Sequence, residues 1–305
     1  MSFLEPRSFV DSSEAMDRTW RLEDSLAYTR WLATHHYENF QVVSFLLPKR
    51  LHQDFYNVYS FCRWADDLGD EFGDVARSLE LLKWWRGLTR EAFEGRAAHP
   101  VFVALRTTIA AHALPDEPFH DLITAFEQDQ TKTRYADWPE VFAYCKNSAN
   151  PVGRLVLYLS GYRDAERQRL SDATCTALQL ANFWQDVSVD WKKDRVYLPQ
   201  ALLTRNGSGD GDIAEGRATE GFRASMREAC DEAQRLFEEG LPLARMVDRR
   251  LSLDLELFSR GGMKIIEKIR QRDYDVLSER PRISKVERVE LLLRGLLRWA
   301  ILRAA

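Results

Sequence analysis

The chain has 305 residues, 45% of them hydrophobic, and a net charge of -4, so it can bury a large core and is not disordered. The charge gives no indication of nucleic-acid binding, and no uncharged apolar run is long enough to cross a membrane. The N-terminus shows no apolar signal sequence, and four widely spaced cysteines indicate neither a zinc site nor a disulfide framework. These features are typical of a cytoplasmic protein.

The hydrophobic periodicity predicts an all-α chain that forms one domain. The expected helices run, in chain order, from Asp24 toward His36, from Pro48 to Ala65, and over 75–93, 101–112, 118–129, 139–160 and 172–190, then from Phe222 with breaks to the end. Ser171 is predicted to cap the helix at 172–190, and Pro151 to interrupt or kink the one at 139–160. The Gly-, Asp- and Ser-rich residues 206–221 are expected to form a mobile loop.

The first informative segment lies at the end of the second expected helix. It carries four carboxylates within six positions, namely Asp66, Asp67, Asp70 and Glu71. Asp66 and Asp70 share a helical face with Tyr59 and Arg63. The preceding turns are apolar on nearly every side, which predicts a buried helix rather than a solvated charged face. Buried carboxylates need a cation or donors, and Mg²⁺ is a suitable cation.

The second informative segment is a polar stripe on an otherwise apolar helix. Its members are Gln179, Asn182, Asp186 and Asp190. At about 100° per residue they occupy one face. Two such stripes facing one another are expected to hold Mg²⁺ between them and to grip a diphosphate. Lys192, Lys193, Arg195 and Tyr197 follow directly, either as a helix end that complements the dipole or as donors to the diphosphate.

Three further segments allow two interpretations each. Residues 144–153 combine small residues with Pro151 and Gly153, which indicates either a close approach to a substrate or a packing kink. The polar-aromatic cluster at 35–40 is either structural or part of a site. The C-terminal residues 291–305 are apolar but carry three arginines, which favours a packed terminal helix, with peripheral membrane contact as the alternative.

Together these segments resemble the squalene and phytoene synthase family over about residues 36–280. The strongest anchors are Tyr59-x3-Arg63-x2-Asp66-Asp67-x2-Asp70, Gln179-x2-Asn182-x3-Asp186-x3-Asp190, and Arg195-Val196-Tyr197-Leu198-Pro199. The resemblance implies a single isoprenoid synthase domain whose helices surround a central apolar cavity. It also implies an enzyme that uses Mg²⁺ to act on an isoprenoid diphosphate.

The resemblance assigns roles to residues of the two motifs. The implied metal ligands are Asp66, Asp70, Asp186 and Asp190, with Asp67 and Glu71 as further candidates in the first motif. The implied diphosphate and substrate contacts are Arg63, Gln179, Asn182, Lys193, Arg195 and Tyr197. Tyr59 and Tyr144 are expected beside the reacting carbon skeleton, where aromatic faces can stabilise a cation.

Two shorter strings, His36-Tyr37-Glu38-Asn39-Phe40 and Ser148-Ala149-Asn150-Pro151-Val152-Gly153, resemble the bacterial hydroxysqualene synthases of hopanoid pathways. This subgroup converts presqualene diphosphate and water to hydroxysqualene, which a separate flavoenzyme then reduces. His36 and Phe40 are expected to contact the substrate. Glu38 and Asn39 depart from the common family pattern and are candidates for positioning the water.

Two other functions are compatible with the sequence. One is a related head-to-head synthase that condenses prenyl diphosphates to presqualene or phytoene diphosphate, or to squalene. The other is a non-catalytic helical interaction protein, which has no need of two carboxylate stripes with associated arginines. The chain contains no GxGxxG string, so no nicotinamide cofactor is expected.

Overall fold

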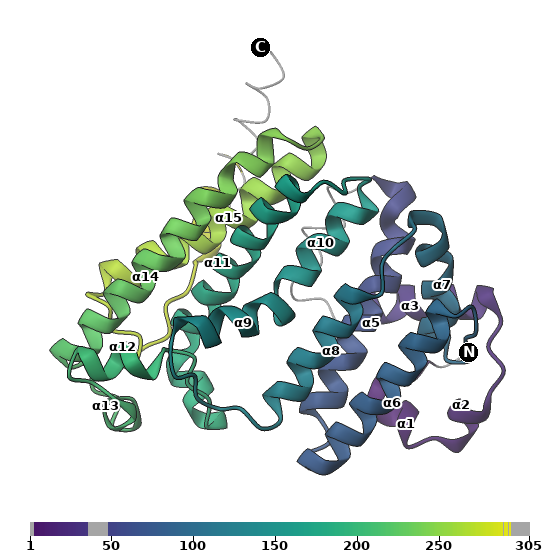
Figure 1. Cartoon of the computed structure of the whole chain (residues 1–305), viewed down its shortest axis with the longest axis horizontal. Helices are drawn as coiled ribbons and strands as arrows, with labels where there is room; N and C mark the ends of the chain where they lie inside the picture. The colour runs from purple at the N-terminus through teal and green to yellow at the C-terminus, as the bar shows by residue number, and fades with distance from the viewer. Residues whose placement is uncertain (1–2, 36–47, 289, 292, 294–305) are drawn as a thin grey trace. The chain divides into compact units, whose positions relative to one another are not determined.

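The computed structural model describes residues 3–35 and 48–288 together with 290, 291 and 293. Every regular element in this described part is helical, and its single β-type pairing is an isolated bridge between Arg134 and Val196. The all-α prediction is therefore confirmed (Figure 1). The helices are α1 (Pro6–Val10), α2 (Ser13–Asp17), α3 (Leu22–His35), η1 (Lys49–Leu51), α5 (His52–Asp70), α6 (Val75–Phe93), α7 (Pro100–His112), α8 (Glu117–Asp129), α9 (Trp138–Ser148), α10 (Asn150–Leu159), α11 (Ala165–Asp190), η2 (Trp191–Lys193), α12 (Gln200–Arg205), α13 (Asp210–Ala214), α14 (Glu220–Gly240), η3 (Leu241–Arg245) and α15 (Arg249–Gln271).

Side-chain caps explain where several helices begin. Asp74 accepts a hydrogen bond from the backbone N–H of Ala76 and starts α6 at the residue that the periodicity predicts. Asp137 caps α9, and Thr219 caps α14, in the same way. α9 ends before Pro151, so the predicted interruption near this proline is confirmed as a break between α9 and α10.

The start of α11 differs from the prediction. Asp164, not Ser171, caps the helix by accepting a hydrogen bond from the N–H of Arg167 at 3.0 Å. Ser171 lies inside α11, and its side chain is buried. Serine favours caps because its hydroxyl is small and polar, but the same small size lets it pack inside a helix interface.

Residues 206–221 do not form a plain loop. They contain α13, and Asp212 accepts hydrogen bonds from Ser208 Oγ at 2.7 Å and from Thr219 Oγ1 at 2.8 Å. Local bonds from aspartate, serine and threonine explain how such a polar stretch adopts a defined path.

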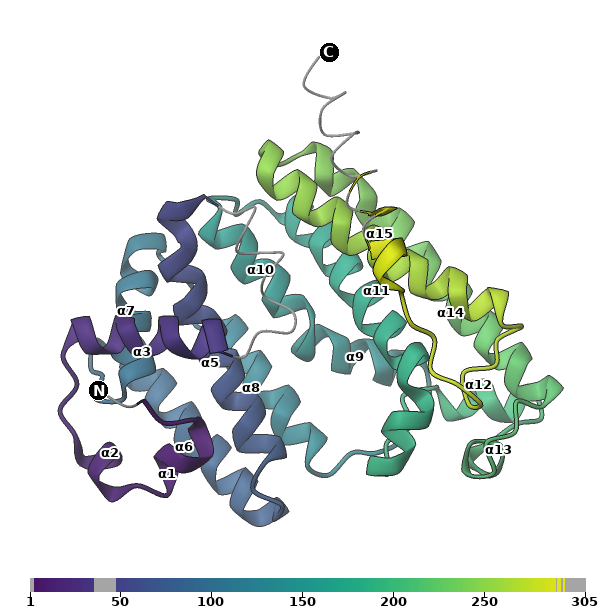
Figure 2. The same cartoon turned by 180° about the vertical axis from the view of Figure 1, so that it is seen from behind.

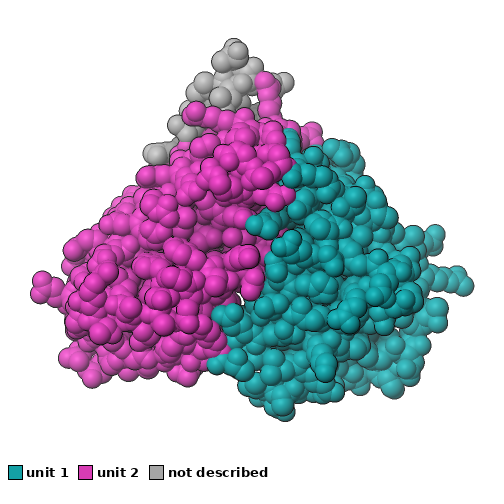
Figure 3. Space-filling view, viewed as in Figure 1, with its two compact units in different colours: residues 1–131, 154–163 teal, residues 132–153, 164–305 magenta. Residues whose placement is uncertain are grey.

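The chain forms two compact units, which Figure 3 colours separately. Unit 1 contains residues 1–131 and 154–163, and unit 2 contains residues 132–153 and 164–305. Within unit 1, α5 packs against α3, α6, α7 and α8 (Figure 2). The unit 1 core is strongly aromatic, with Phe61, Trp64 and Trp85 fully buried. This packing fixes the helix that carries the first acidic motif.

Unit 2 is built around α11. α14 and α15 run beside it (Figure 1), and their buried faces contribute Phe222, Phe237 and Ile266 to the core. Trp184 of α11 is fully buried and donates a hydrogen bond to the carbonyl of Ala229 at 3.0 Å. Trp184 therefore packs in the unit 2 core and anchors α11 to α14.

One buried carboxyl of unit 2 lacks the partners that such groups normally have. Asp254 of α15 is 3% exposed, and neither of its oxygens has a hydrogen-bond partner within the part of the chain that the structure describes. Burial, together with the charge of Asp248, raises the pKa of Asp254 from 3.8 to about 8.

In the described residues, no helix is long and apolar enough to cross a membrane.

Candidate active site

The acidic motif of α5 is organised around Arg63. Its guanidinium pairs with Asp67, with Glu71 at 3.6 Å, and more distantly with Asp66 at 3.8 Å. Asp67 is 3% exposed, whereas half of the Asp66 side chain is exposed, and Asp70 is also exposed. The motif thus has an inner carboxylate that is held by arginine and an outer pair that can reach a ligand.

Burial changes the acidity of this motif. Burial raises the pKa of Asp67 from 3.8 to about 7, and the nearby Glu71 adds to the effect while Arg63 opposes it. Burial also raises the pKa of the Tyr59 phenol, one turn before Arg63. Asp67 therefore depends on a neighbouring cation for its charge, which Arg63 supplies in this structure.

The second motif occupies the open face of α11, as the spacing predicts. Asn182 is exposed and Gln179 is half-buried, while the intervening Leu180, Ala181 and Phe183 are buried. The sequence of the helix accounts for this pattern, because its polar residues recur at helical spacing on an apolar background.

The two carboxylates of this motif are in different electrostatic situations. Asp186 forms a bidentate ion pair with Arg280, whose Nε donates to Oδ1 and whose Nη2 donates to Oδ2 at 3.0 Å. Burial, followed by the charge of Asp186, raises the pKa of Asp190 from 3.8 to about 7, while Arg195, Lys193 and Arg280 oppose the rise. Lys193 and Arg195 are thus close enough for their charges to act on this motif.

Tyr144 and Tyr197 lie together in an aromatic cluster. The ring of Tyr197 stacks on Phe183, with centroids 3.7 Å apart and planes 4° apart, and on Tyr135 at 5.5 Å. Tyr144 contacts the same three rings at 5.5–6.0 Å. The structure therefore brings two of the predicted site residues into one buried aromatic group at the end of α11.

The segment after α11 is held by Arg134. Its guanidinium donates to the carbonyl and carboxylate of Asp194 and to Asp210 Oδ2 at 2.7 Å, and it stacks over Trp191 at 5.3 Å. Asp194 adopts a left-handed backbone with φ +56°, which non-glycine residues rarely adopt without external support. The N–H of Val196 also donates to the carbonyl of Thr133 at 2.9 Å. These contacts fix the path that presents Arg195 and Tyr197.

The small-residue string around Gly153 is used for helix packing. A Cβ at Gly153 would lie 2.5 Å from Cys175 Sγ and closer still to Ser171 Oγ, so α10 approaches α11 through this glycine. Asn150 accepts a hydrogen bond from Thr176 Oγ1 at 2.9 Å at the same interface. These contacts support the packing interpretation of the string.

The donor set suits a hard divalent cation. Both motifs present carboxylate oxygens, and Asp190 is a partly buried carboxyl whose charged form is disfavoured by burial and favoured by nearby cations. Within the described residues, no three His, Cys, Asp or Glu side chains form a ready-made metal cage. Mg²⁺ typically takes one or two carboxylates and completes its shell with water and substrate phosphate, so two carboxylates on a helix are compatible with it.

The site predicted from the sequence differs from the observed one in two groups of residues: some predicted residues are not described, and some contacting residues were not predicted. His36, Glu38, Asn39 and Phe40 lie outside the residues that the structure describes. Arg280, Arg134 and Tyr135 were not among the predicted site residues, although each contacts a predicted residue or the loop that carries it. Arg280 stands 94 positions from Asp186, so no local pattern could reveal the pair.

The sequence profile of the squalene/phytoene synthase family matches residues 33–287. An enzyme named hydroxysqualene synthase from Rhodopseudomonas palustris is 34% identical over 257 residues, which are 83% of this chain and 86% of the relative. A phytoene synthase from Thermus thermophilus is 32% identical over 264 residues, 86% of this chain and 89% of the relative.

Among solved structures, squalene synthase HpnC from Alicyclobacillus acidocaldarius superposes with a TM-score of 0.80 at 46% identity. The match covers 83% of this chain and 96% of that protein.

Proposed function

The chain belongs to the squalene/phytoene synthase family and is an enzyme of isoprenoid biosynthesis, and from this premise we propose that it converts presqualene diphosphate and water to hydroxysqualene and diphosphate. The observation that carries the proposal is the 34% identity to an enzyme named hydroxysqualene synthase. The two acidic motifs supply the chemistry that a diphosphate leaving group requires.

The proposed reaction is a substitution at carbon. The carbon–oxygen bond to diphosphate breaks, and its electron pair leaves with the diphosphate. The carbocation rearranges, a water oxygen bonds to it, and one proton is released. No oxidant or reductant takes part, so the reaction needs no NADPH.

Asp66, Asp70, Asp186 and Asp190 would hold the metal ions, with Asp67 and Glu71 beside them. Bound Mg²⁺ would neutralise the diphosphate oxygens and so stabilise the leaving group. Lys193 and Arg195, whose charges act on Asp190, would donate hydrogen bonds to the same oxygens. Arg63 pairs with Asp67, the inner carboxylate of its own motif.

The aromatic cluster offers the faces that a carbocation needs. Tyr197 stacks on Phe183, Tyr144 lies tilted against both, and all three rings are largely withdrawn from water. Aromatic faces attract positive charge, and a dry surrounding prevents early capture of the cation. Glu38 and Asn39 remain the proposed residues for placing the one water that ends the reaction.

A second candidate function is favoured by the similarity to a phytoene synthase at 32% identity. In this alternative the enzyme condenses two prenyl diphosphates head to head. The two functions differ in their substrate, because only the second consumes farnesyl or geranylgeranyl diphosphate alone.

The deciding experiment supplies the purified chain with Mg²⁺ and one substrate at a time, and identifies products by mass spectrometry. Presqualene diphosphate should give hydroxysqualene without NADPH, and EDTA should abolish turnover until Mg²⁺ is restored. Turnover that persists after thorough metal removal refutes the metal role. Squalene that forms only with NADPH refutes the hydroxysqualene assignment. A flavin-dependent reductase added afterwards should consume the alcohol, which would establish the proposed coupling.

A further inference from the structure

The segment that follows α15 runs back along the helices of unit 2 and meets the acidic motif of α11. We define residues 275–287 as the strap (Figure 2). Its Arg280 pairs with Asp186, and the carbonyl of the next residue, Pro281, accepts a hydrogen bond from Gln185 Nε2 at 2.6 Å. Two neighbouring residues of α11 are therefore bound by two neighbouring residues of the strap.

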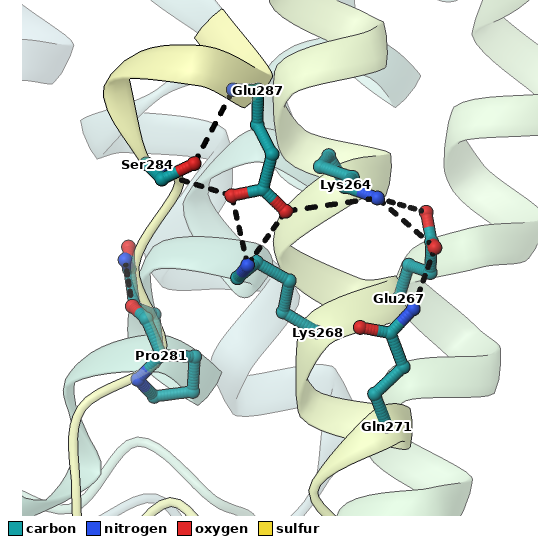
Figure 4. Close-up of polar contacts among 8 residues, drawn as sticks. Lys264, Glu267, Lys268, Gln271, Pro281, Ser284 and Glu287 are labelled. Carbon is teal, nitrogen blue, oxygen red and sulfur yellow. Dashed lines mark hydrogen bonds and ion pairs between the residues drawn. The ribbon is translucent and has the colours of Figure 1, made fainter.

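The strap is fixed on both sides of Arg280 by contacts that do not involve this arginine. On one side, Asp275 Oδ2 pairs with Arg223 Nη2 of α14 at 3.7 Å. On the other side, Glu287 accepts from Lys268 Nζ at 2.7 Å and from the N–H of Ser284 at 2.7 Å (Figure 4). The backbone on both sides of Arg280 is therefore tied to unit 2 by contacts other than the Asp186 pair.

The Arg280–Asp186 ion pair involves the same carboxylate oxygens that would coordinate a metal ion. Both carboxylate oxygens of Asp186 accept from the Arg280 fork, and the guanidinium brings a full positive charge to this position. Arg280 also acts through its charge on Asp190, one turn further along α11. A divalent cation that binds Asp186 must therefore compete with Arg280 for this carboxylate.

We propose that the Arg280 guanidinium takes the place of a metal ion at Asp186 in the metal-free chain. The ion pair must open when a divalent cation binds this carboxylate. The inference rests on the proposed metal role of Asp186. It makes Arg280 a positioning residue that neutralises Asp186 without metal, and that weakens metal binding when no substrate is present.

The test is a titration of the purified full chain with MnCl₂, in which electron paramagnetic resonance measures free Mn²⁺. Arg280→Gln removes the charge while keeping most of the side-chain length, and it should tighten Mn²⁺ binding about tenfold, because a charge-assisted pair no longer competes. Arg282→Gln is the matched control, since Arg282 is an exposed arginine two residues along the same strap. The control should bind Mn²⁺ as the wild type does.

Two further variants complete the test. In Asp186→Asn/Arg280→Gln the gain should disappear, because the released carboxylate is absent. Arg280→Lys keeps the charge but loses the fork, and it should tighten binding by a smaller factor. If Arg280→Gln fails to fold, as judged by circular dichroism, Arg280→Lys decides, and affinity equal to that of Arg282→Gln overturns the inference.

The same titration with inorganic diphosphate separates the two proposals. A wild-type chain that takes up no Mn²⁺ under either condition removes the metal role and this inference together. A wild-type chain that binds Mn²⁺, with Arg280→Gln no tighter than Arg282→Gln, overturns the inference alone.

Discussion

The buried carboxyl of Asp254 predicts a stability that falls as pH rises. Its pKa is 3.8 in an unfolded chain and about 8 in the folded one. Between these values the folded state holds a proton that the unfolded state has released, so stability is lost as pH rises through this window. At pH 7, about three pH units above 3.8, the cost is about 4 kcal/mol at roughly 1.4 kcal/mol per unit.

Replacing the Asp254 carboxyl should raise the free energy of unfolding at pH 7 by most of this cost. Asp254→Leu removes the titrating group, so its gain in the free energy of unfolding over the wild type should be about 4 kcal/mol larger at pH 7 than at pH 4. Asp254→Asn should gain less, because a buried amide without partners costs about 1–3 kcal/mol. Asp248→Asn can still cap α15 but removes the smaller of the two causes of the raised pKa of Asp254, so it should show a small part of the pH-dependent gain.

The assay is chemical denaturation of wild type and variants at pH 4, 5.5, 7 and 8.5, comparing free energies of unfolding at each pH. The other titrating groups are common to the wild type and Asp254→Leu, so their contributions cancel in that difference. The difference between wild type and Asp254→Leu should widen steadily from pH 4 to pH 8. A difference that is independent of pH would refute the reasoning, because it would mean that Asp254 is not the group that binds the proton.

Three other outcomes are expected. Asp186→Asn should lower turnover at least a hundredfold, since a charged metal ligand is lost. The free energy of unfolding should change by only about 1 kcal/mol, because the Arg280–Asp186 pair is partly exposed. Near-native turnover would mean that the polar stripe of α11 is structural. Gly153→Ala should destabilise the chain by about 2 kcal/mol, because its methyl group overlaps Ser171 and Cys175; an unchanged melting temperature would contradict the close packing. Glu38→Gln should still consume presqualene diphosphate but shift products from the alcohol toward hydrocarbons, as measured by mass spectrometry, and an unchanged ratio at reduced stability would assign Glu38 a structural role.

Helical periodicity predicted much of the fold because each helix carries its own signal. The bounds of α6 follow from the Asp74 cap and a regular apolar face, and the polar face of α11 follows from spacing alone. The prediction that α11 begins after Ser171 was wrong. Serine is a favourable capping residue, but Ser171 is buried by the helix that packs against it, and this contact is not visible in the local sequence. A local pattern cannot separate these two uses of a small hydroxyl residue.

Contacts between distant segments explain what the sequence missed in the site. Arg280 lies in a short charged string that looks like an exposed loop, and Arg134 precedes a helix without any motif of its own. Their importance comes from what lies beside them after folding, namely Asp186 and Asp194. The acidic residues themselves were visible because carboxylates are rare on an apolar helix.

The 26-residue length of α11 also determines which changes of chain length the enzyme can accept. The N-terminal half of the helix is locked against its neighbours at Ser171 and Thr174, while the C-terminal half presents the carboxylates. One residue inserted between the halves would rotate the carboxylates by about 100° relative to the packed half, and would advance them by about 1.5 Å. Insertions should therefore be excluded between positions 171 and 190, and natural or engineered length variation should accumulate in the turns outside α11, such as the one at Gly207–Gly209.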